Sequence, residues 1–136
     1  MAKLILTDAS ITVNSVALST LSNSITLTYE KDSVEVTAFG DAGHKFTGGL
    51  QNNTCDMQLF QDFAATMTEA TIYPLVGTPT TIVIKPTSGA VSATNPSYTL
   101  TDTMLVSHTP VAGAVGEVAM TSLSFTGGTL VKSTGA

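Results

Sequence analysis

Residues 24–38, SITLTYEKDSVEVTA, decide the expected fold class because apolar and polar side chains alternate along them. The alternation comes in two runs, 24–30 and 33–38, and each run places its apolar side chains on one face. A period of two with one apolar face is typical of a strand in a sheet that is packed on one side. We therefore expect two strands joined as a β-hairpin by a turn at Lys31 and Asp32.

A glycine-rich segment follows at residues 39–53, and no strand or helix period is visible in it. Loops of about 12–15 residues without structure of their own are uncommon in compact domains and are usually functional or disordered. This segment also contains Phe39, Phe46 and Leu50, a composition that does not simply prefer water. We expect a loop that becomes ordered against another copy of the chain, and the alternative is a mobile surface loop.

One helix is expected at about residues 67–76. The sequence TMTE at residues 66–69 is a capping box, which marks the start of a helix. Pro74 lies inside the expected range and should shorten or kink the helix. We expect the helix to cover one end or face of the sheet, with Ala70 and Tyr73 among its packing residues.

The rest of the chain contains more strand-like runs and no linker long enough to divide it, so residues 1–136 suit a single domain. With about eight or nine strands and one helix, the expected fold class is all-β with one flanking α-helix, built as a β-sandwich or small barrel. The further runs are residues 3–6, 10–13, 16–18, 54–60, 80–85, 98–107 and 117–125, followed by a short tail at 129–136.

The composition narrows the function classes. Charged residues make up 11 % of the chain, against about 25 % in typical globular proteins, so neighbouring copies can cover such a surface. The net charge is −5 and there is no Arg, which argues against nucleic-acid binding through neutralised phosphates. There is no charged and apolar leader and no apolar run of membrane-spanning length. We expect no membrane insertion and a protein that stays inside the cell that makes it.

Residues with catalytic or metal-binding potential are few. Cys55 is the single cysteine, so the chain can form neither an internal disulfide nor a cysteine cluster for a metal. The two histidines, His44 and His108, lack the spacing of a metal-binding motif. Glu30 and Glu35 could lie close together, but two exposed acids beside a turn are more typical of a solvated face. We therefore expect no enzyme, no cofactor, and no catalytic or metal-binding residues.

Several stretches in chain order carry a family pattern. They are LILTDASITVNSVAL (4–18), ITLTYEKDSVEVTAFGDAGH (25–44), QDFAATMTEATIYPLVGT (61–78), TTIVIKPTSGAVSATNPSYT (80–99) and HTPVAGAVGEVAMTSLSFTGG (108–128). Together they resemble the tail tube proteins, or major tail proteins, of long-tailed, lambda-like bacteriophages over nearly the whole chain. The likeness is strongest in TAFGD at residues 37–41 and in GAVGE at residues 113–117.

The resemblance implies an assembly. Such proteins form a β-sandwich with one flanking helix, and six copies close into a ring by joining strands, so that the inner strands make a continuous barrel around a lumen. Rings stack into a tube through a long loop and the chain ends. The implied location is the virion tail, after assembly in the host cytoplasm.

The resemblance also implies partners. The first partner is the chain itself, as homohexameric rings stacked into a tube. The tube polymerises around a tape-measure protein, and a tail terminator and tail-tip proteins belong to the same assembly. The genome is ejected through the lumen, where DNA passes without specific binding.

Two sets of site residues follow from the loop and from the strand pattern. The loop is expected to make contacts between rings, and the polar face of three successive strands, which carries no Lys, is expected to face the lumen. The inter-ring set is Phe39, Gly40, Asp41, Gly43, His44, Phe46, Gly48 and Gly49. The lumen-facing set is Thr26, Thr28, Glu30, Glu35, Thr37, Asp56 and Gln58.

Other functions remain open at this point. A capsid decoration protein or a tail-terminator ring is also small and β-rich. A carbohydrate-binding β-sandwich would need exposed Trp or Tyr platforms, and this chain has no Trp and three Tyr. Electron microscopy separates these classes, because a tube protein forms hollow filaments, a terminator forms single rings and a binding module stays monomeric.

Overall fold

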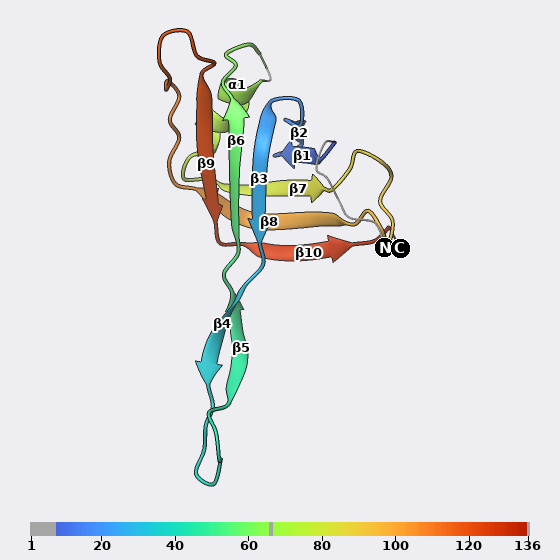
Figure 1. Cartoon of the computed structure of the whole chain (residues 1–136), viewed down its shortest axis with the longest axis vertical. Coiled ribbons are helices and arrows are strands. Elements are labelled where there is room, and N and C mark those ends of the chain that lie inside the picture. The colour runs from blue at the N-terminus through green and yellow to red at the C-terminus, as the bar shows by residue number, and fades with distance from the viewer. Residues whose placement is uncertain (1–7, 66, 136) are drawn as a thin grey trace.

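The computed structural model describes residues 8–65 and 67–135 and has a β-rich body with a long projection at one end (Figure 1). The predicted all-β fold class with one flanking α-helix is confirmed. In order, the elements of the described residues are β1 (Ser10–Val13), β2 (Val16–Ala17), β3 (Ser22–Thr28), β4 (Lys31–Glu35), β5 (Phe46–Gln51), β6 (Thr54–Phe60), α1 (Thr68–Ile72), the 3-10 turn η1 (Tyr73–Leu75), β7 (Pro79–Lys85), β8 (Ser97–Leu105), β9 (Met120–Thr126) and β10 (Thr129–Ser133).

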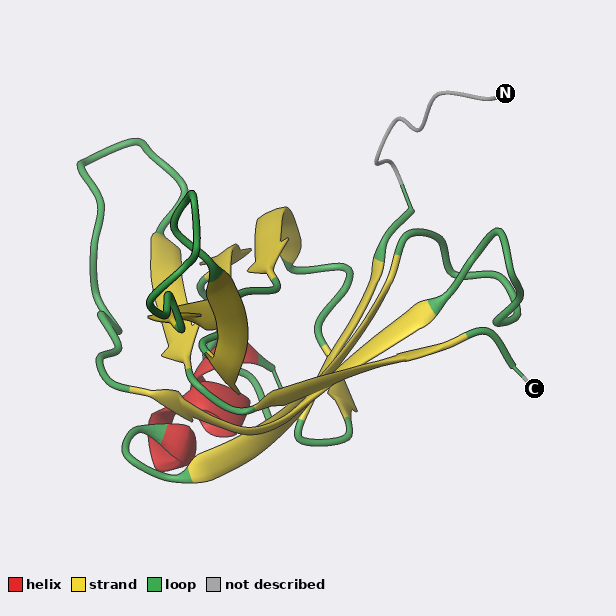
Figure 2. Ribbon diagram, turned by 90° about the horizontal axis from the view of Figure 1, so that it is seen from below, coloured by secondary structure: helices red, strands yellow, loops and turns green. Residues whose placement is uncertain are grey.

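The body is a sandwich made by one antiparallel sheet that folds over on itself. The strand order is β2-β1-β7-β8-β9-β6-β3, and β10 pairs with β8 outside this path. Figure 1 shows β3, β6 and β9 running along the long axis of the molecule, while β7, β8 and β10 run across it. Figure 2, viewed along the long axis, shows the second group in length and the first group nearly end-on. These two groups are the two layers of the sandwich.

Two corners connect the layers. β8 pairs with β10 as far as Thr101, and its last residues, Met104 and Leu105, pair with β9. Asp102 lies between these pairings and has a φ of +60°, so the strand changes direction there. Gly128 turns the chain from β9 into β10 with a φ of +91°, and a Cβ there would lie 2.4 Å from the Thr101 carbonyl oxygen. Only glycine fits this second corner.

The hydrophobic core lies between the layers. In β6, Cys55, Met57 and Leu59 are buried, as the alternation predicts. Burial raises the pKa of the Cys55 thiol to about 12, and the nearby Asp56 charge adds to the shift, so this cysteine is a packing residue. The buried hydrophobic residues are Ile11, Val13, Leu18, Cys55, Met57, Leu59, Ile72, Leu75, Ile82, Ile84, Leu100, Leu105, Leu123 and Phe125.

The predicted helix at residues 67–76 is shortened, as the position of Pro74 predicts. It consists of α1 followed by η1, and Val76 is already extended. Pro74 explains the change, because proline has no N–H for an α-helical bond and its ring clashes with the preceding turn. The predicted packing residues Ala70 and Tyr73 are wrong, since both are exposed. The buried residues of this segment are Thr68, Thr71, Ile72 and Leu75.

The predicted capping box stays a prediction, because its first residue, Thr66, lies outside the described residues. The N-cap is Met67, which makes no side-chain cap hydrogen bond. The carboxylate of Glu69 contacts His108 and Gln61, whose side chains approach α1 from other parts of the chain. Glu69 therefore links α1 to distant segments.

The predicted hairpin at residues 24–38 is wrong. β3 pairs with β6, and β4 pairs with β5, so the two alternating runs do not pair with each other. Lys31 and Asp32 lie within β4 and not in a turn. Alternation identifies a strand and its faces, but it does not determine which other strand supplies the hydrogen bonds.

The glycine-rich segment at residues 39–53 is also more ordered than predicted. Its second half contains β5, which forms a separate two-stranded sheet with β4. Gly49 lies in β5, and a Cβ there would lie 3.2 Å from Cγ2 of Val34, so glycine allows the two strands to approach closely. Residues 31–51 form the projection seen in Figure 1, and we call them the arm.

Two smaller differences concern the chain ends. The predicted tail at residues 129–136 contains β10, which pairs with β8. The expected run at residues 3–6 lies outside the described residues. Within the described part of the chain, no helix has the length and apolar character needed to cross a membrane.

Candidate functional site

The arm exposes apolar side chains along its whole length. Every residue from 31 to 50 is exposed except Asp41, which is partly exposed. Phe39 at the tip is 110 % exposed, and Phe46 and Leu50 are 60 % and 81 % exposed. A two-stranded hairpin alone is only marginally stable in water, and clustered exposed apolar groups are typical of an interaction site. The arm therefore offers a surface for another molecule to cover.

The tip of the arm is held by its own polar contacts. Oε2 of Glu35 accepts a hydrogen bond from Oγ1 of Thr37 at 2.8 Å and lies 2.6 Å from Nδ1 of His44. The backbone N–H of Lys45 donates to Oγ1 of Thr37 at 2.9 Å. These contacts, first with His44 and then with Thr37, lower the pKa of the Glu35 carboxyl group.

A second set of contacts closes the turn at the tip. Oδ2 of Asp41 accepts from the backbone N–H of Ala38 at 2.8 Å, and its Oδ1 lies 3.0 Å from Nζ of Lys45. The Ala38 amide and then the Lys45 ammonium lower the pKa of Asp41. Gly40 has a φ of +93°, which the turn requires. The predicted inter-ring residues therefore lie on an ordered hairpin.

The root of the arm is fixed to the body by Asn53, which is fully buried. Its Oδ1 accepts from the backbone N–H of Glu30 at 3.2 Å. Its Nδ2 donates to Oε1 of Gln51 at 2.9 Å and to the carbonyl oxygen of Gly128 at 3.1 Å. One side chain thus joins both strands of the arm to the corner between β9 and β10.

Gln51 extends the same network. Its Oε1 also accepts from the backbone N–H of Leu130 at 3.0 Å, and the N–H of Gly127 donates to the carbonyl oxygen of Asn53 at 2.9 Å. The arm is therefore held in place by the layer corner. Sequence reasoning did not identify Asn53 or Gln51, because their partners lie more than 70 residues away and no local pattern signals them.

A polar strand face covers the outside of β3, β6 and β9. In the ladders, Thr26 lies opposite Asp56, and Asp56 lies opposite Ser124, so these side chains point to the same side. The alternate residues of β6 and β9 point into the core. The polar strand face consists of Ser24, Thr26, Thr28, Thr54, Asp56, Gln58, Ser122, Ser124 and Thr126.

This face contains four of the seven predicted lumen residues, Thr26, Thr28, Asp56 and Gln58. The other three lie elsewhere. Glu35 ends β4 and Thr37 follows it on the arm, while Glu30 lies at the root of the arm. The prediction assumed that three successive strands share one polar face. This assumption is wrong for these three residues, because β4 belongs to a separate two-stranded sheet. Their orientation toward a lumen stays a prediction.

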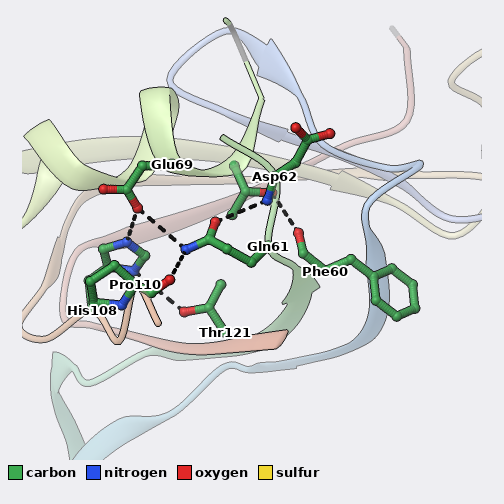
Figure 3. A network of polar contacts seen from close by, with 8 residues as sticks. Phe60, Gln61, Asp62, Glu69, His108, Pro110 and Thr121 are labelled. Atoms are coloured by element: carbon green, nitrogen blue, oxygen red, sulfur yellow. Dashed lines mark hydrogen bonds and ion pairs between the residues drawn. The ribbon is translucent and has the colours of Figure 1, made fainter. Parts of the chain in front are cut away.

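A partly buried polar cluster holds the loop at residues 106–119 against α1 (Figure 3). The His108 side chain is 3 % exposed, and its Nε2 lies 2.8 Å from Oε2 of Glu69. Nε2 of Gln61 donates to the carbonyl oxygen of Pro110 at 2.6 Å. Thr121 lies 3.4 Å from Nδ1 of His108.

The composition of this cluster is similar to a hydroxyl, imidazole and carboxylate catalytic set, but its burial does not suit catalysis. Thr121 is 1 % exposed, so a substrate cannot reach its hydroxyl group. The imidazole and carboxylate bond to groups of the fold itself. The cluster therefore has a structural role, because it joins the loop at residues 106–119 to Gln61 and to α1. Among the described residues, no group of three or more His, Cys, Asp and Glu side chains could hold a metal ion.

Comparison with known proteins gives structural relatives only. No protein-family model and no curated protein matches the chain. A chain of the gene transfer agent virion superposes with a TM-score of 0.71 at 15 % identity, covering 93 % of this chain and 95 % of that one. The chain shares its fold with a component of the gene transfer agent virion.

Chains from two structures of an extracellular contractile injection system, PVC, also share the fold. A chain of its extended sheath–tube complex gives a TM-score of 0.70 at 10 % identity, covering 97 % of this chain and 92 % of that one. A chain of its extended sheath/tube terminator gives 0.72 at 12 % identity, with 97 % of both chains covered. Identities this low establish the fold alone. They do not single out lambda-like phages among the particles that use it.

Proposed function

We propose that this chain is a structural, non-enzymatic subunit of the tube of a phage tail or related injection particle, in which hexameric rings stack through the arm. The observation that carries the proposal is the arm, a hairpin with exposed Phe39, Phe46 and Leu50 that is anchored at its root by Asn53. The fold shared with chains of sheath–tube and virion structures supports it.

The arm suits a head-to-tail contact. It leaves one end of the long axis, while α1 and the loop at residues 106–119 lie at the other end (Figure 1). That loop carries Val111, Val115 and Val118, which are 82 %, 104 % and 68 % exposed. Apolar groups at two opposite ends can pair between copies, and a contact between different surfaces repeats into a filament. We expect the arm of one ring to pack against this end of the next ring.

The polar strand face suits a lumen wall. Its nine side chains are hydroxyl or amide groups except for one carboxylate, Asp56, and none is cationic. Lys and Arg are the groups that hold DNA phosphates, so a wall without them lets DNA pass. In this proposal the tube forms around a tape-measure protein, and its ends contact terminator and tip proteins.

Electron microscopy of the purified protein at high concentration tests the proposal. The unaltered chain should form hollow filaments with sixfold symmetry in cross-section. The double variant Phe39→Ser, Leu50→Ser should fold but form few or no filaments. The matched control is Val131→Ser, which removes a side chain that is 58 % exposed on β10 of the body and not on the arm. Normal filaments from the double variant, or only monomers from the unaltered chain, would contradict the proposal.

A second assay tests the lumen wall. Ser124→Lys places a cation on the polar strand face, and Thr81→Lys makes a similar change on β7 of the other layer. Particles assembled with Ser124→Lys should deliver DNA more slowly, while Thr81→Lys should leave delivery unchanged. Equal rates for the two variants would count against the assigned face.

A ring that terminates a tube is the second candidate, because one of the similar chains comes from a sheath/tube terminator structure. The same microscopy separates the two functions. Single rings that do not stack at any concentration favour the terminator.

A further inference from the structure

A pocket of about 400 Å³ lies at the end of the body opposite the arm, between η1 and the loop at residues 106–119. Its walls are formed by Tyr73, Val76, His108 and Pro110. Tyr73 begins η1 and Val76 directly follows it, while the other two residues belong to the loop. Two segments that are far apart in the sequence therefore form the pocket.

The walls are held in place, yet their apolar parts are uncovered. The polar cluster of Figure 3 fixes the loop wall, since the His108 imidazole bonds to a carboxylate on α1 and the Pro110 carbonyl oxygen accepts from Gln61 at 2.6 Å. Tyr73 and Val76 are nevertheless 66 % and 41 % exposed. A preformed pocket with an exposed aromatic wall suits an apolar side chain, and aromatic rings pack well there.

The tip of the arm carries a side chain of matching size. Phe39 is 110 % exposed there. A cavity of about 150 Å³ holds a benzene molecule, so the larger pocket has room for its phenyl ring. The arm and the pocket lie at opposite ends of the long axis (Figure 1). A head-to-tail arrangement of two copies therefore brings the tip of one arm to the end that holds the pocket of the next.

Charge at the two ends is also complementary. The tip contains two acid–base pairs, and in each the basic side chain is the more exposed. His44 is 77 % exposed beside Glu35 at 48 %, and Lys45 is 65 % exposed beside Asp41 at 19 %. Residues 61–78 and 106–119 contain no Lys or Arg, and their carboxylates are Asp62, Glu69 and Glu117. Such complementarity orients an encounter between copies more than it adds affinity.

We propose that Phe39 of one copy inserts into this pocket of the next copy. The inference rests on the proposed function, because it names the contact through which stacked rings hold one another. The arm delivers the aromatic side chain, and the polar cluster of Figure 3 sets the shape of the receiving pocket. The buried His108 thereby has a positioning role in assembly.

Disulfide trapping in filaments of the full chain tests the contact. The double variant Ala38→Cys, Val111→Cys keeps Phe39 and all four walls, and it places one cysteine beside Phe39 and the other beside Pro110. Mild oxidation should give a ladder of covalent oligomers on a non-reducing gel. The native Cys55 is fully buried and does not compete. The matched control, Ala38→Cys with Val131→Cys on β10 of the body, should give no ladder.

The outcomes separate this contact from the proposed function. Filaments that form without a ladder would overturn the pocket contact and leave the tube function standing. Absence of filaments from the unaltered chain would overturn both. Covalent dimers from filaments of the single variant Ala38→Cys would show that arm tips meet each other, which also overturns the pocket contact.

A double-mutant cycle tests the pair directly. Phe39→Ala removes the ring, and Val76→Trp narrows the pocket. Each should raise the critical concentration for filament formation at least about tenfold, as expected for a central aromatic contact. The two changes act on one contact, so together they should be no worse than the worse single variant. Losses that multiply would contradict the contact, and Val131→Trp, the matched control, should leave the critical concentration unchanged.

Discussion

The arm and the layer of β3 and β6 are built from the same two passages of chain, yet one is exposed and the other is half-buried. β3 continues into β4, and β5 continues into β6, so both regions are antiparallel pairs with alternating side chains. Met57 in the layer is 3 % exposed, whereas Val34 in the arm is 46 % exposed. The difference is the second layer, which faces β6, whereas no second layer faces β5 among the described residues. The apolar face of a strand with alternating side chains is buried only where a second layer or another molecule packs against it.

The largest expected effect contrasts two phenylalanines. Phe125 of β9 is fully buried, and Phe46 of β5 is 60 % exposed. Phe125→Ala should lower the free energy of unfolding by about 3–5 kcal/mol, since it leaves a cavity in a packed core. Phe46→Ala should change the free energy of unfolding by less than about 0.5 kcal/mol, because the side chain is on the surface. Urea denaturation of the monomer measures both, and similar losses would show that the arm is packed in solution.

The next effect concerns the joint between the two regions. Asn53→Ala removes the hydrogen bonds to Glu30, Gln51 and Gly128, so the part-buried N–H of Glu30 and carbonyl of Gly128 lose their bonds to this side chain. We expect a loss of about 1–3 kcal/mol in the free energy of unfolding. We also expect faster backbone motion throughout the arm in nitrogen relaxation measurements. Asn52→Ala, at an exposed neighbouring position, is the matched control. Unchanged arm motion in Asn53→Ala would contradict its role as the joint.

A smaller effect should follow the pH at the tip of the arm. The folded state lowers the pKa of Glu35 through His44 and then Thr37, so the carboxylate stabilises the tip above its unfolded pKa. This contribution is lost as the pH falls through the folded pKa of Glu35, which lies below the ordinary value of a glutamate. Chemical shifts of Thr37 and Lys45 should change together in that acidic range. Glu35→Gln should remove the Glu35 titration from the Thr37 shifts, while the Lys45 shifts still follow the Asp41 carboxylate that Lys45 contacts. An unchanged Thr37 profile would contradict the assignment.

The alternation at residues 54–60 was sufficient to predict β6 and its buried face, because the pattern is local and one face is apolar. The same reasoning failed at residues 24–38, because β3 pairs with residues 26 to 37 positions further along the chain and β4 with residues 11 to 20 positions further along. The sequence identified the residues at the tip of the arm as one functional segment, but it did not predict that they form a structured hairpin. That structure depends on side-chain contacts such as the one between Glu35 and His44. Asn53 was missed because its role appears only when the corner at Gly128 is folded beside it.

By itself, the order of residues determined that this protein is built from strands, which side chains of β6 face inward, and that Pro74 shortens its helix, because each depends on near neighbours in the chain. Only the tertiary structure decided which strands pair, where the second layer stops, and therefore which apolar side chains are left uncovered on the arm. The physical reason is that burial and strand pairing depend on groups brought together from distant parts of the chain, and no local pattern states which groups those are.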